Sequence, residues 1–131
     1  MTSKVTYLGD LRTECTHLLS GQKIITDAPP DNQGKGEAFS PTDLTATSLA
    51  TCILTTMGIR AKELDITGVR AEVTKIMASD PRRISRIEVK IKMPKNDFSD
   101  KDKKVLEGIA RTCPVALSLS ENIEQVIDFE W

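Results

Sequence analysis

Three cysteines are the residues of this chain whose type could carry redox or metal chemistry. Cys15, Cys52 and Cys113 form no C-x-x-C pair and His17 is the only histidine, which argues against a structural zinc site. Their odd number argues against a secreted scaffold held together by disulfides. Two interpretations remain, namely buried cysteines that only pack and cysteines that carry thiol chemistry.

Cys52 lies in the middle of a segment with the pattern of a buried helix. The sequence Ser40-Pro41-Thr42-Asp43 combines an N-cap serine, a proline at the first helical position and an acid three residues after the cap. We expect the helix to run from Pro41 to about Glu63. No charged residue occurs from Leu44 to Ile59, and a helix that is apolar nearly all round is a buried one. This segment is therefore predicted to be the central helix of the fold.

A thiolate at Cys52 would need a positive charge nearby, because free cysteine is mostly protonated at neutral pH and burial raises a thiol pKa further. Arginine suits this role, since it stays charged and its planar guanidinium can hold a thiolate and a carboxylate together. The preferred candidate is Arg12, at the start of a predicted strand just after Gly9-Asp10. Arg60 and Arg111 are more simply interpreted as solvated residues.

Cys113 immediately precedes Pro114, which interrupts a second predicted helix. A peroxide converts a cysteine thiolate to a sulfenic acid, and a nearby thiol converts that acid to a disulfide. Cys113 could supply this second thiol to Cys52. The two cysteines are 61 residues apart, so only the fold decides whether they meet.

The remaining segments predict an α+β fold, because runs of strands are separated by two helices. The expected elements are strands at Lys4–Tyr7, Leu11–Leu19 and Lys23–Thr26, a loop rich in proline and glycine at Asp27–Phe39, a strand at Val69–Thr74 whose phase breaks near Ile76, an antiparallel strand at Arg86–Met93, a helix from Asp97 or Ser99 to about Thr112, a short turn through Leu119 and a last strand at Gln125–Trp131.

Length and charge exclude several classes of protein. The chain has 131 residues, which fits a single domain over residues 1–131. A net charge of -1 argues against nucleic-acid binding, and the basic stretch Arg82–Lys104 is interspersed with acids as on a solvated face. The apolar stretch Leu49–Met57 is too short to cross a membrane, and the N-terminus lacks the apolar core of a secretion signal. We expect a cytoplasmic protein, and a dimer would cover its thin core.

Three motifs together resemble the signature of the OsmC/Ohr family (osmotically inducible protein C and organic hydroperoxide resistance protein). They are Ser40-Pro41-Thr42-Asp43-Leu44, Leu49-Ala50-Thr51-Cys52 and Cys113-Pro114-Val115, and the 11 residues from Pro41 to Cys52 fit the family spacing. The predicted elements also follow the family's order along nearly the whole chain. The resemblance implies an OsmC-like fold, with antiparallel sheets wrapped around the Cys-bearing helix and a second helix. It also implies an intertwined homodimer with active sites at the subunit interface.

The same resemblance implies a thiol-dependent peroxidase that reduces organic and, by extension, inorganic hydroperoxides. Cys52 would be the peroxidatic cysteine, Cys113 the resolving cysteine and Arg12 the arginine that stabilises the thiolate. No bound cofactor or metal is expected. An external dithiol, such as a lipoyl group, would reduce the Cys52–Cys113 disulfide.

One position departs from the hydroperoxide-resistance branch, in which a glutamate follows the helix proline and holds the arginine. That position is Thr42 here, so the chain is closer to the general OsmC-like branch. Asp43 or Glu37 could take the role of the missing carboxylate, although Asp43 is equally well explained as a capping acid. Cys15 matches no family cysteine, and both it and His17 are interpreted as structural.

Two functions of different classes follow from these observations. In the first, an enzyme, Cys52 attacks the distal peroxide oxygen, and the apolar residues Phe39, Leu49, Ile53 and Met57 line a pocket for an alkyl substrate. The second is a non-catalytic dimer on the same fold, which binds a small apolar ligand and whose cysteines are inert. The enzyme is favoured because the paired cysteines have the family's spacing.

Overall fold

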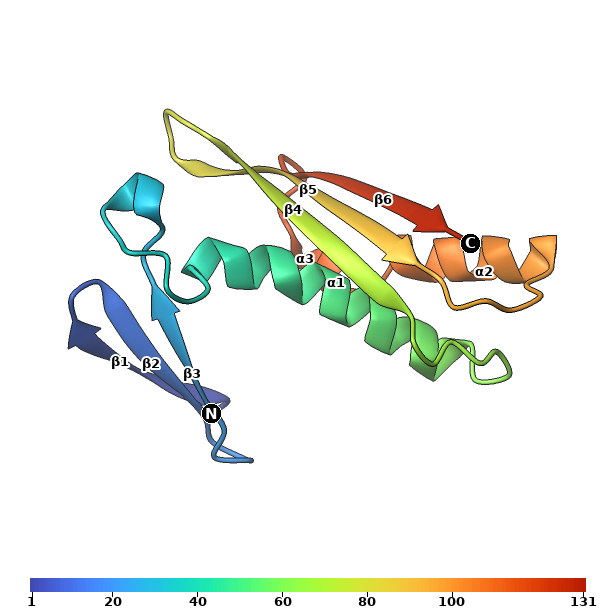
Figure 1. The fold of residues 1–131 in the computed structure, drawn as a ribbon, viewed down its shortest axis with the longest axis horizontal. Coiled ribbons are helices and arrows are strands. Elements are labelled where there is room, and N and C mark those ends of the chain that lie inside the picture. The colour runs from blue at the N-terminus through green and yellow to red at the C-terminus, as the bar shows by residue number, and fades with distance from the viewer. The chain divides into compact units, whose positions relative to one another are not determined.

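The fold is α+β, as the sequence predicts, with two three-stranded sheets and a long helix (Figure 1). The computed structural model describes all 131 residues. Contacts divide them into two compact units, Met1–Thr45 and Ala46–Trp131. The boundary falls within the first turns of the long helix. The single domain expected from the chain length stays a prediction.

The N-terminal unit contains an antiparallel sheet of the strands β1 (Ser3–Gly9), β2 (Arg12–His17) and β3 (Lys23–Asp27). All three strands are predicted from the sequence, with small differences at their ends. The most consequential difference is at β3, which extends by one residue and so takes Asp27 out of the loop and into the sheet.

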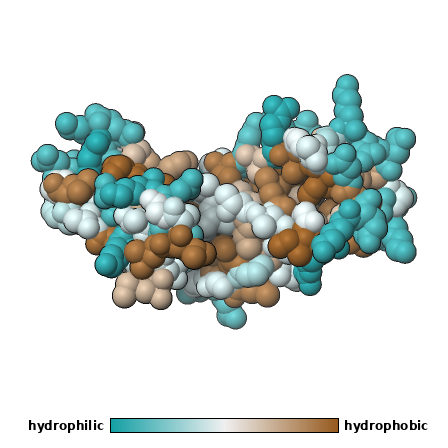
Figure 2. All heavy atoms as spheres, turned by 90° about the horizontal axis from the view of Figure 1, so that it is seen from below, coloured by the Kyte–Doolittle hydropathy of each residue, from teal (hydrophilic) through white to brown (hydrophobic).

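One face of this sheet is apolar and uncovered. Val5 lies opposite Cys15, which lies opposite Ile24, and Tyr7 shares their face because strand side chains alternate. Val5, Tyr7 and Ile24 each expose half or more of their surface. Figure 2 shows that hydrophobic residues reach the molecular surface among hydrophilic ones. A sheet face with this composition ordinarily packs against another surface.

The loop after β3 is tightly wound rather than extended. It contains the short helix η1 (Pro30–Asn32), and the Gly34 N–H donates to the Pro29 carbonyl at 3.0 Å. A Cβ atom at Gly34 would lie 1.6 Å from the Ala28 carbonyl oxygen, so only glycine fits there. The loop returns to the end of β3, where the Asp27 N–H donates to the Phe39 carbonyl at 3.1 Å.

Helix α1 (Pro41–Arg60) begins at the predicted residue, because its capping box is formed. The Asp43 N–H donates to Ser40 Oγ at 3.1 Å, and the Ser40 N–H donates to Asp43 Oδ2 at 2.9 Å. The helix ends three residues before the predicted Glu63. A turn replaces its last part, since the Leu64 N–H donates to the Ala61 carbonyl.

The C-terminal unit has a sheet in the order β4 (Arg70–Ala78), β5 (Arg83–Lys92) and β6 (Glu124–Glu130). The register of β4 shifts between Ile76 and Met77, which confirms the predicted break in phase. The prediction of purely antiparallel sheets is wrong here, because β5 and β6 run parallel. Between these strands the chain passes through two helices, and a crossover of this length is what parallel pairing requires.

These two helices are α2 (Asp100–Arg111) and α3 (Pro114–Ser118). Ser99 caps α2 in a capping box with Asp102, as one of the two expected caps. Figure 1 shows the helices on one face of the C-terminal sheet. That arrangement leaves the other face of the sheet to the charged residues that alternate along β5.

The hydrophobic core lies in the C-terminal unit, between its sheet and its helices. Every buried apolar residue of the chain belongs to this core. It consists of Ala46, Leu49, Ala50, Ile53, Met57, Ala61, Ile84, Ile87, Val89, Ile91, Leu106, Ile109, Ala110, Cys113, Ala116 and Ile127. In the N-terminal unit the buried residues are instead polar, namely Thr26, Asp27 and Ser40.

Truncating a core residue of α2 should destabilise the fold far more than truncating its exposed neighbour. Leu106 has no exposed surface, whereas Val105 is 45% exposed. Leu106→Ala should lower the free energy of unfolding by about 2–5 kcal/mol, because a cavity replaces its contacts. Val105→Ala should cost less than about 1 kcal/mol. Urea unfolding followed by circular dichroism measures both values, and equal losses would contradict the assigned core.

Candidate active site

Cys52 and Cys113 meet in the C-terminal unit, although 61 residues separate them in the sequence. Cys52 projects from α1, and the Val115 N–H at the start of α3 donates to its Sγ at 3.4 Å. Thr56 Oγ1, one turn further along α1, lies 3.9 Å from the same sulfur. The packing of α1 against the start of α3 thus places both thiols in one cluster.

Cys113 is the N-cap of α3, in an extended conformation. Pro114 forces this arrangement, because a residue before proline is disfavoured in a helix while proline suits the first helical position. The Ala116 N–H donates to Cys113 Sγ at 3.4 Å, which satisfies one of the free donors of the new helix. The break between α2 and α3 therefore turns a cysteine and backbone donors toward α1.

The two sulfur atoms differ in exposure. Cys52 is half-buried, whereas Cys113 has no exposed surface. Burial raises the pKa of the Cys113 thiol, and a hydrogen bond with Cys52 and the charge of that neighbour raise it further, against backbone donors that lower it. Cys113 is thereby kept as a thiol while Cys52 is open to a reactant. This geometry suits Cys52 as the nucleophile and Cys113 as a second thiol that reacts after it.

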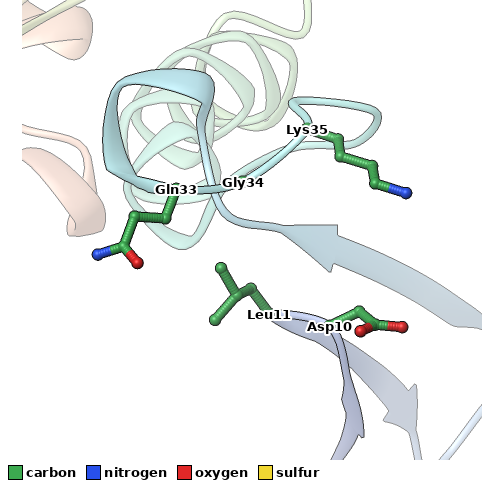
Figure 3. A pocket seen from close by; sticks show the side chains of 5 residues that line it. All are labelled: Asp10, Leu11, Gln33, Gly34 and Lys35. Atoms are coloured by element: carbon green, nitrogen blue, oxygen red, sulfur yellow. The ribbon is translucent and has the colours of Figure 1, made fainter.

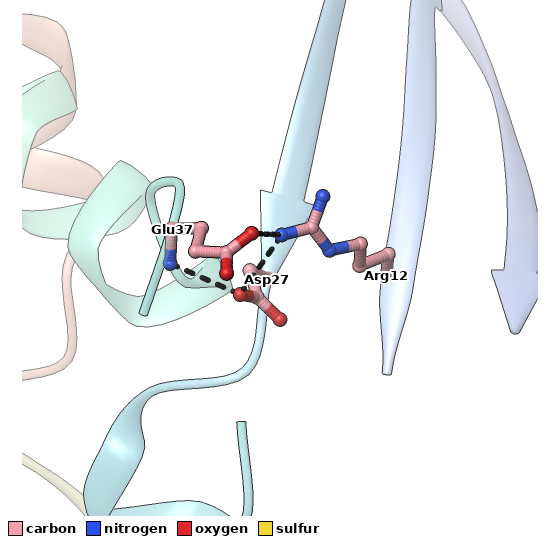
Figure 4. Close-up of polar contacts among 3 residues, drawn as sticks. All are labelled: Arg12, Asp27 and Glu37. Carbon is pink, nitrogen blue, oxygen red and sulfur yellow. Dashed lines mark hydrogen bonds and ion pairs between the residues drawn. The ribbon is translucent and has the colours of Figure 1, made fainter. Parts of the chain in front are cut away.

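Arg12 lies at the start of β2 and pairs with two carboxylates (Figure 4). Its Nη2 donates to Glu37 Oε2 at 2.5 Å and to Asp27 Oδ2 at 3.5 Å. The Glu37 N–H also donates to Asp27 Oδ2, at 3.0 Å. The guanidinium, the strand end and the loop thus form one network within the N-terminal unit.

Both carboxylates bind the same nitrogen of the guanidinium. Figure 4 shows Nη1 and Nε of Arg12 turned away from Asp27 and Glu37. A guanidinium has five N–H donors in a fixed plane, so Asp27 and Glu37 leave the donors on these two nitrogens unused. Arg12 is therefore oriented by its partners while it keeps donors for a further anion.

Asp27 is a residue of this network that the sequence reasoning missed. It sits in β3 directly opposite Arg12, and its side chain is 1% exposed. Its pKa is lowered, chiefly by the hydrogen bond from the Glu37 backbone and also by the Arg12 charge, against the opposing effect of burial. The sequence does contain a signal for this contact. Counting the strand register back from the β2–β3 hairpin turn pairs Asp27 with Arg12.

Of the two carboxylates proposed to hold the arginine, Glu37 is the one that contacts it. Asp43 instead forms the capping box of α1 described above. Thr42, at the position where the resemblance to the hydroperoxide-resistance branch implies a glutamate, has its Oγ1 3.3 Å from Ser40 Oγ. Arg12 belongs to the N-terminal unit and Cys52 to the C-terminal unit, so the pairing of these two side chains stays a prediction.

The predicted substrate-pocket residues divide into two groups. Leu49, Ile53 and Met57 have no exposed surface and belong to the core, and their role in a substrate pocket stays a prediction. They are buried because they share the side of α1 that packs against the sheet and α2. Phe39 is exposed and lies in the N-terminal unit.

The other candidate residues have ordinary surroundings. Arg60 and Arg111 are exposed, as expected of solvated residues. His17 Nδ1 contacts Ser20 Oγ at 2.6 Å in the hairpin connection, and Cys15 Sγ lies 3.9 Å from Thr13 Oγ1 in the sheet. These contacts fit the structural roles predicted for both residues.

Two hollows of the surface lie away from the cysteines. One, of about 530 Å³, is lined by Lys95, Asn96, Asp97 and Trp131. The other, of about 330 Å³, lies between the β1–β2 turn and the loop after β3, and Figure 3 shows Leu11 extending toward Gln33 and Gly34 there. No group of three or more potential metal ligands is assembled, and no helix has the length and apolarity needed to cross a membrane.

Comparison with known proteins shows which family this chain belongs to. A family model described as OsmC-like protein matches residues 34–127, which include both cysteines and Glu37. The chain belongs to the OsmC-like protein family. Its resemblance to this family in the sequence motifs is thereby confirmed. No curated protein matches the chain.

Solved structures of OsmC-like proteins share the fold over nearly the full length of this chain. A protein from Psychrobacter arcticus 273-4, to which osmotic stress induction and a detoxification response are provisionally ascribed, is 56% identical with a TM-score of 0.95, covering 99% of this chain and 96% of that chain. The organic hydroperoxide resistance protein OhrB of Bacillus subtilis is 18% identical with a TM-score of 0.67, covering 99% and 98%. An organic hydroperoxide resistance protein OsmC from Legionella pneumophila is 14% identical with a TM-score of 0.73, covering 100% and 98%. The last two likenesses show the fold alone.

The surroundings of Cys52 and Cys113 predict that the two thiols react at different rates. An acid whose pKa is raised stays protonated over a wider pH range, so Cys113 should carry less thiolate at any given pH than a free cysteine. Its burial should slow it further. We expect iodoacetamide to alkylate Cys52 at least about tenfold faster than Cys113, because the thiolate is the nucleophile and must be accessible.

Mass spectrometry of peptides after timed alkylation measures both rates across a series of pH values. In urea the two rates should become similar, because unfolding removes the difference in burial. Faster alkylation of Cys113 in the folded protein would contradict the assigned geometry.

Proposed function

We propose that this OsmC-like protein is a thiol-dependent peroxidase that reduces organic hydroperoxides. The observation that carries the proposal is the cluster of a half-buried Cys52 with a fully buried Cys113. A cysteine peroxidase needs both an accessible nucleophile and a second thiol within reach of it. The names of the related hydroperoxide resistance proteins support the same substrate class.

The first step is the attack of the Cys52 thiolate on the distal oxygen of the hydroperoxide. The S–O bond forms as the O–O bond breaks, and the alkoxide leaves and takes up a proton to become an alcohol. Cys52 is oxidised to a sulfenic acid, and the peroxide is reduced. The Val115 N–H donates to this sulfur at 3.4 Å and so helps to hold it in place for the attack.

The second step joins the two cysteines. The Cys113 sulfur attacks the sulfenic sulfur of Cys52, a disulfide forms, and the hydroxyl group departs as water with the thiol proton of Cys113. An external dithiol of the lipoyl type then reduces the disulfide and is itself oxidised to a cyclic disulfide. This requirement suits a reducing compartment such as the cytoplasm, where the protein would act as an antioxidant in the response to oxidative stress.

Arg12 is proposed to act on the charge that this chemistry creates. Its Nη1 and Nε are turned away from Asp27 and Glu37. These donors could stabilise the thiolate before the attack and the peroxide oxygens during it. A guanidinium already oriented by carboxylates needs little reorganisation at that moment.

We also propose that the protein works as a homodimer. The apolar face of the β1–β2–β3 sheet is uncovered, and no apolar residue of the N-terminal unit is buried. A second copy of the chain would cover that face, in line with the intertwined dimer that the family resemblance implies.

The enzyme proposal predicts a specific oxidation product. Treatment of the protein with cumene hydroperoxide should form a Cys52–Cys113 disulfide, and with dihydrolipoamide the protein should turn over. Cys52→Ser should lower kcat/KM at least about a thousandfold, because it removes the nucleophile. Cys113→Ser should still consume about one peroxide per chain, because Cys52 alone carries the first step, and it should form no internal disulfide.

Mass spectrometry of the oxidised peptides and a coupled peroxide assay measure these outcomes. Cys15→Ser is the matched control, since Cys15 lies in the sheet of the N-terminal unit. Because Cys15 is on the proposed dimer face, its variant is compared as a dimer verified by sedimentation equilibrium, and it should keep the wild-type rate. A wild-type protein that forms no internal disulfide and consumes no hydroperoxide would leave the non-catalytic apolar-ligand protein as the better description.

The dimer proposal predicts that a charge on the uncovered sheet face breaks the assembly. Ile24→Lys should give a monomer in sedimentation equilibrium, because a buried lysine at an apolar interface would be desolvated without a partner. Thr6→Lys is the matched control, since Thr6 pairs with Glu14 on the opposite face. A monomeric wild-type protein, or equal effects of the two variants, would contradict the proposed interface.

A further inference from the structure

Arg12 is held by two carboxylates of very different character. The Asp27 side chain is 1% exposed, and the Glu37 side chain is 59% exposed. Both contact the same nitrogen of the guanidinium. This difference in exposure implies that the Asp27 and Glu37 contacts have different roles in holding Arg12.

Asp27 cannot leave its position without a large penalty. A buried carboxylate needs hydrogen-bond donors, and here they include the Glu37 backbone N–H at 3.0 Å, the Ala28 backbone and the Arg12 guanidinium at 3.5 Å. The backbone also fixes it, because Asp27 and Arg12 are directly opposed residues of neighbouring antiparallel strands. The Asp27 N–H also donates a hydrogen bond to the Phe39 carbonyl.

Glu37, in contrast, contacts Arg12 only through an exposed side chain. Exposed ion pairs contribute little net free energy, since water screens them and ordering two long side chains costs entropy. A competing anion can therefore replace the Glu37 carboxylate at low cost. The Glu37 backbone stays bound to Asp27 throughout, because that hydrogen bond does not involve the side chain.

We propose that Asp27 is the positioning residue that fixes Arg12, and that Glu37 is an exchangeable second partner that gives way to the reacting anion. Asp27 acts through Arg12 and does not touch the substrate. The proposal rests on the proposed function, in which Arg12 stabilises the Cys52 thiolate and the peroxide oxygens. It also explains how the chain dispenses with a glutamate at position 42, because the carboxylate that orients the arginine comes from the neighbouring strand.

The test compares two nearly isosteric substitutions in the full-length protein. Asp27→Asn should lower kcat/KM for cumene hydroperoxide by about ten- to a hundredfold, since a misplaced catalytic group costs about that much. The loss should fall mainly on kcat, and the rate–pH profile should shift to higher pH. Glu37→Gln should change kcat/KM by less than about threefold, because an exposed ion pair contributes little.

Glu14→Gln is the matched control, because Glu14 lies on the same strand as Arg12 and pairs with Lys23 at 3.0 Å. It should leave the rate and the pH profile unchanged. A larger effect of Glu37→Gln than of Asp27→Asn would overturn the proposal. So would an Asp27→Asn protein with the wild-type rate and pH profile.

A second measurement does not depend on the folding of the Asp27 variant. In Glu37→Gln, the NMR signal of the Arg12 side-chain Nε–H should stay as ordered as in the wild type, because Asp27 still holds the guanidinium. Disorder of that signal in Glu37→Gln would overturn the proposal. A wild-type protein without peroxidase activity would instead refute the proposed function, while the Arg12 signal would still report whether Asp27 fixes the arginine.

Discussion

The chemistry proposed for this chain depends on one interruption of helical structure, between α2 and α3 at Cys113-Pro114. Proline ends the run of α2 and starts α3, so Cys113 becomes a cap whose sulfur accepts a hydrogen bond from the Ala116 N–H. The Val115 N–H, from the same helix start, donates to Cys52 Sγ on α1. A continuous helix through residue 113 would have consumed those donors in its own hydrogen bonds. The two sulfur atoms would then have had no shared electrostatic environment.

The cysteine pair and the arginine network are held in place by different forces. The cysteines are brought together by apolar packing, since α1 and α3 both belong to the hydrophobic core. The arginine is oriented by charge and strand register instead, in a unit whose buried residues are polar. Packing makes the distance between the sulfur atoms insensitive to ionic strength. The arginine network has an exposed outer partner, and that partner responds to solvent and to competing anions.

The positions of most helices and strands follow from local signals in the sequence, but the pairing of the strands does not. The capping boxes at Ser40 and Ser99 set the starts of α1 and α2, and alternation along β5 identifies its buried face. Alternation carries no information on strand direction, so the parallel pairing of β5 with β6 escaped prediction. Asp27 was missed for a related reason. The proline- and glycine-rich pattern after β3 predicts a loop from Asp27 on, whereas the hairpin register places Asp27 opposite Arg12.

The lack of buried apolar side chains in the N-terminal unit has a thermodynamic consequence. A segment of 45 residues with no fully buried apolar side chain gains little hydrophobic free energy within its own chain to offset the entropy of ordering itself. If a second copy supplies the missing cover, folding and association become one equilibrium, and the midpoint of thermal unfolding rises with protein concentration. Dilution would then release the strand that carries Arg12 before it disturbs the core that carries the cysteines. The amount of protein present would set how much of it is competent for catalysis.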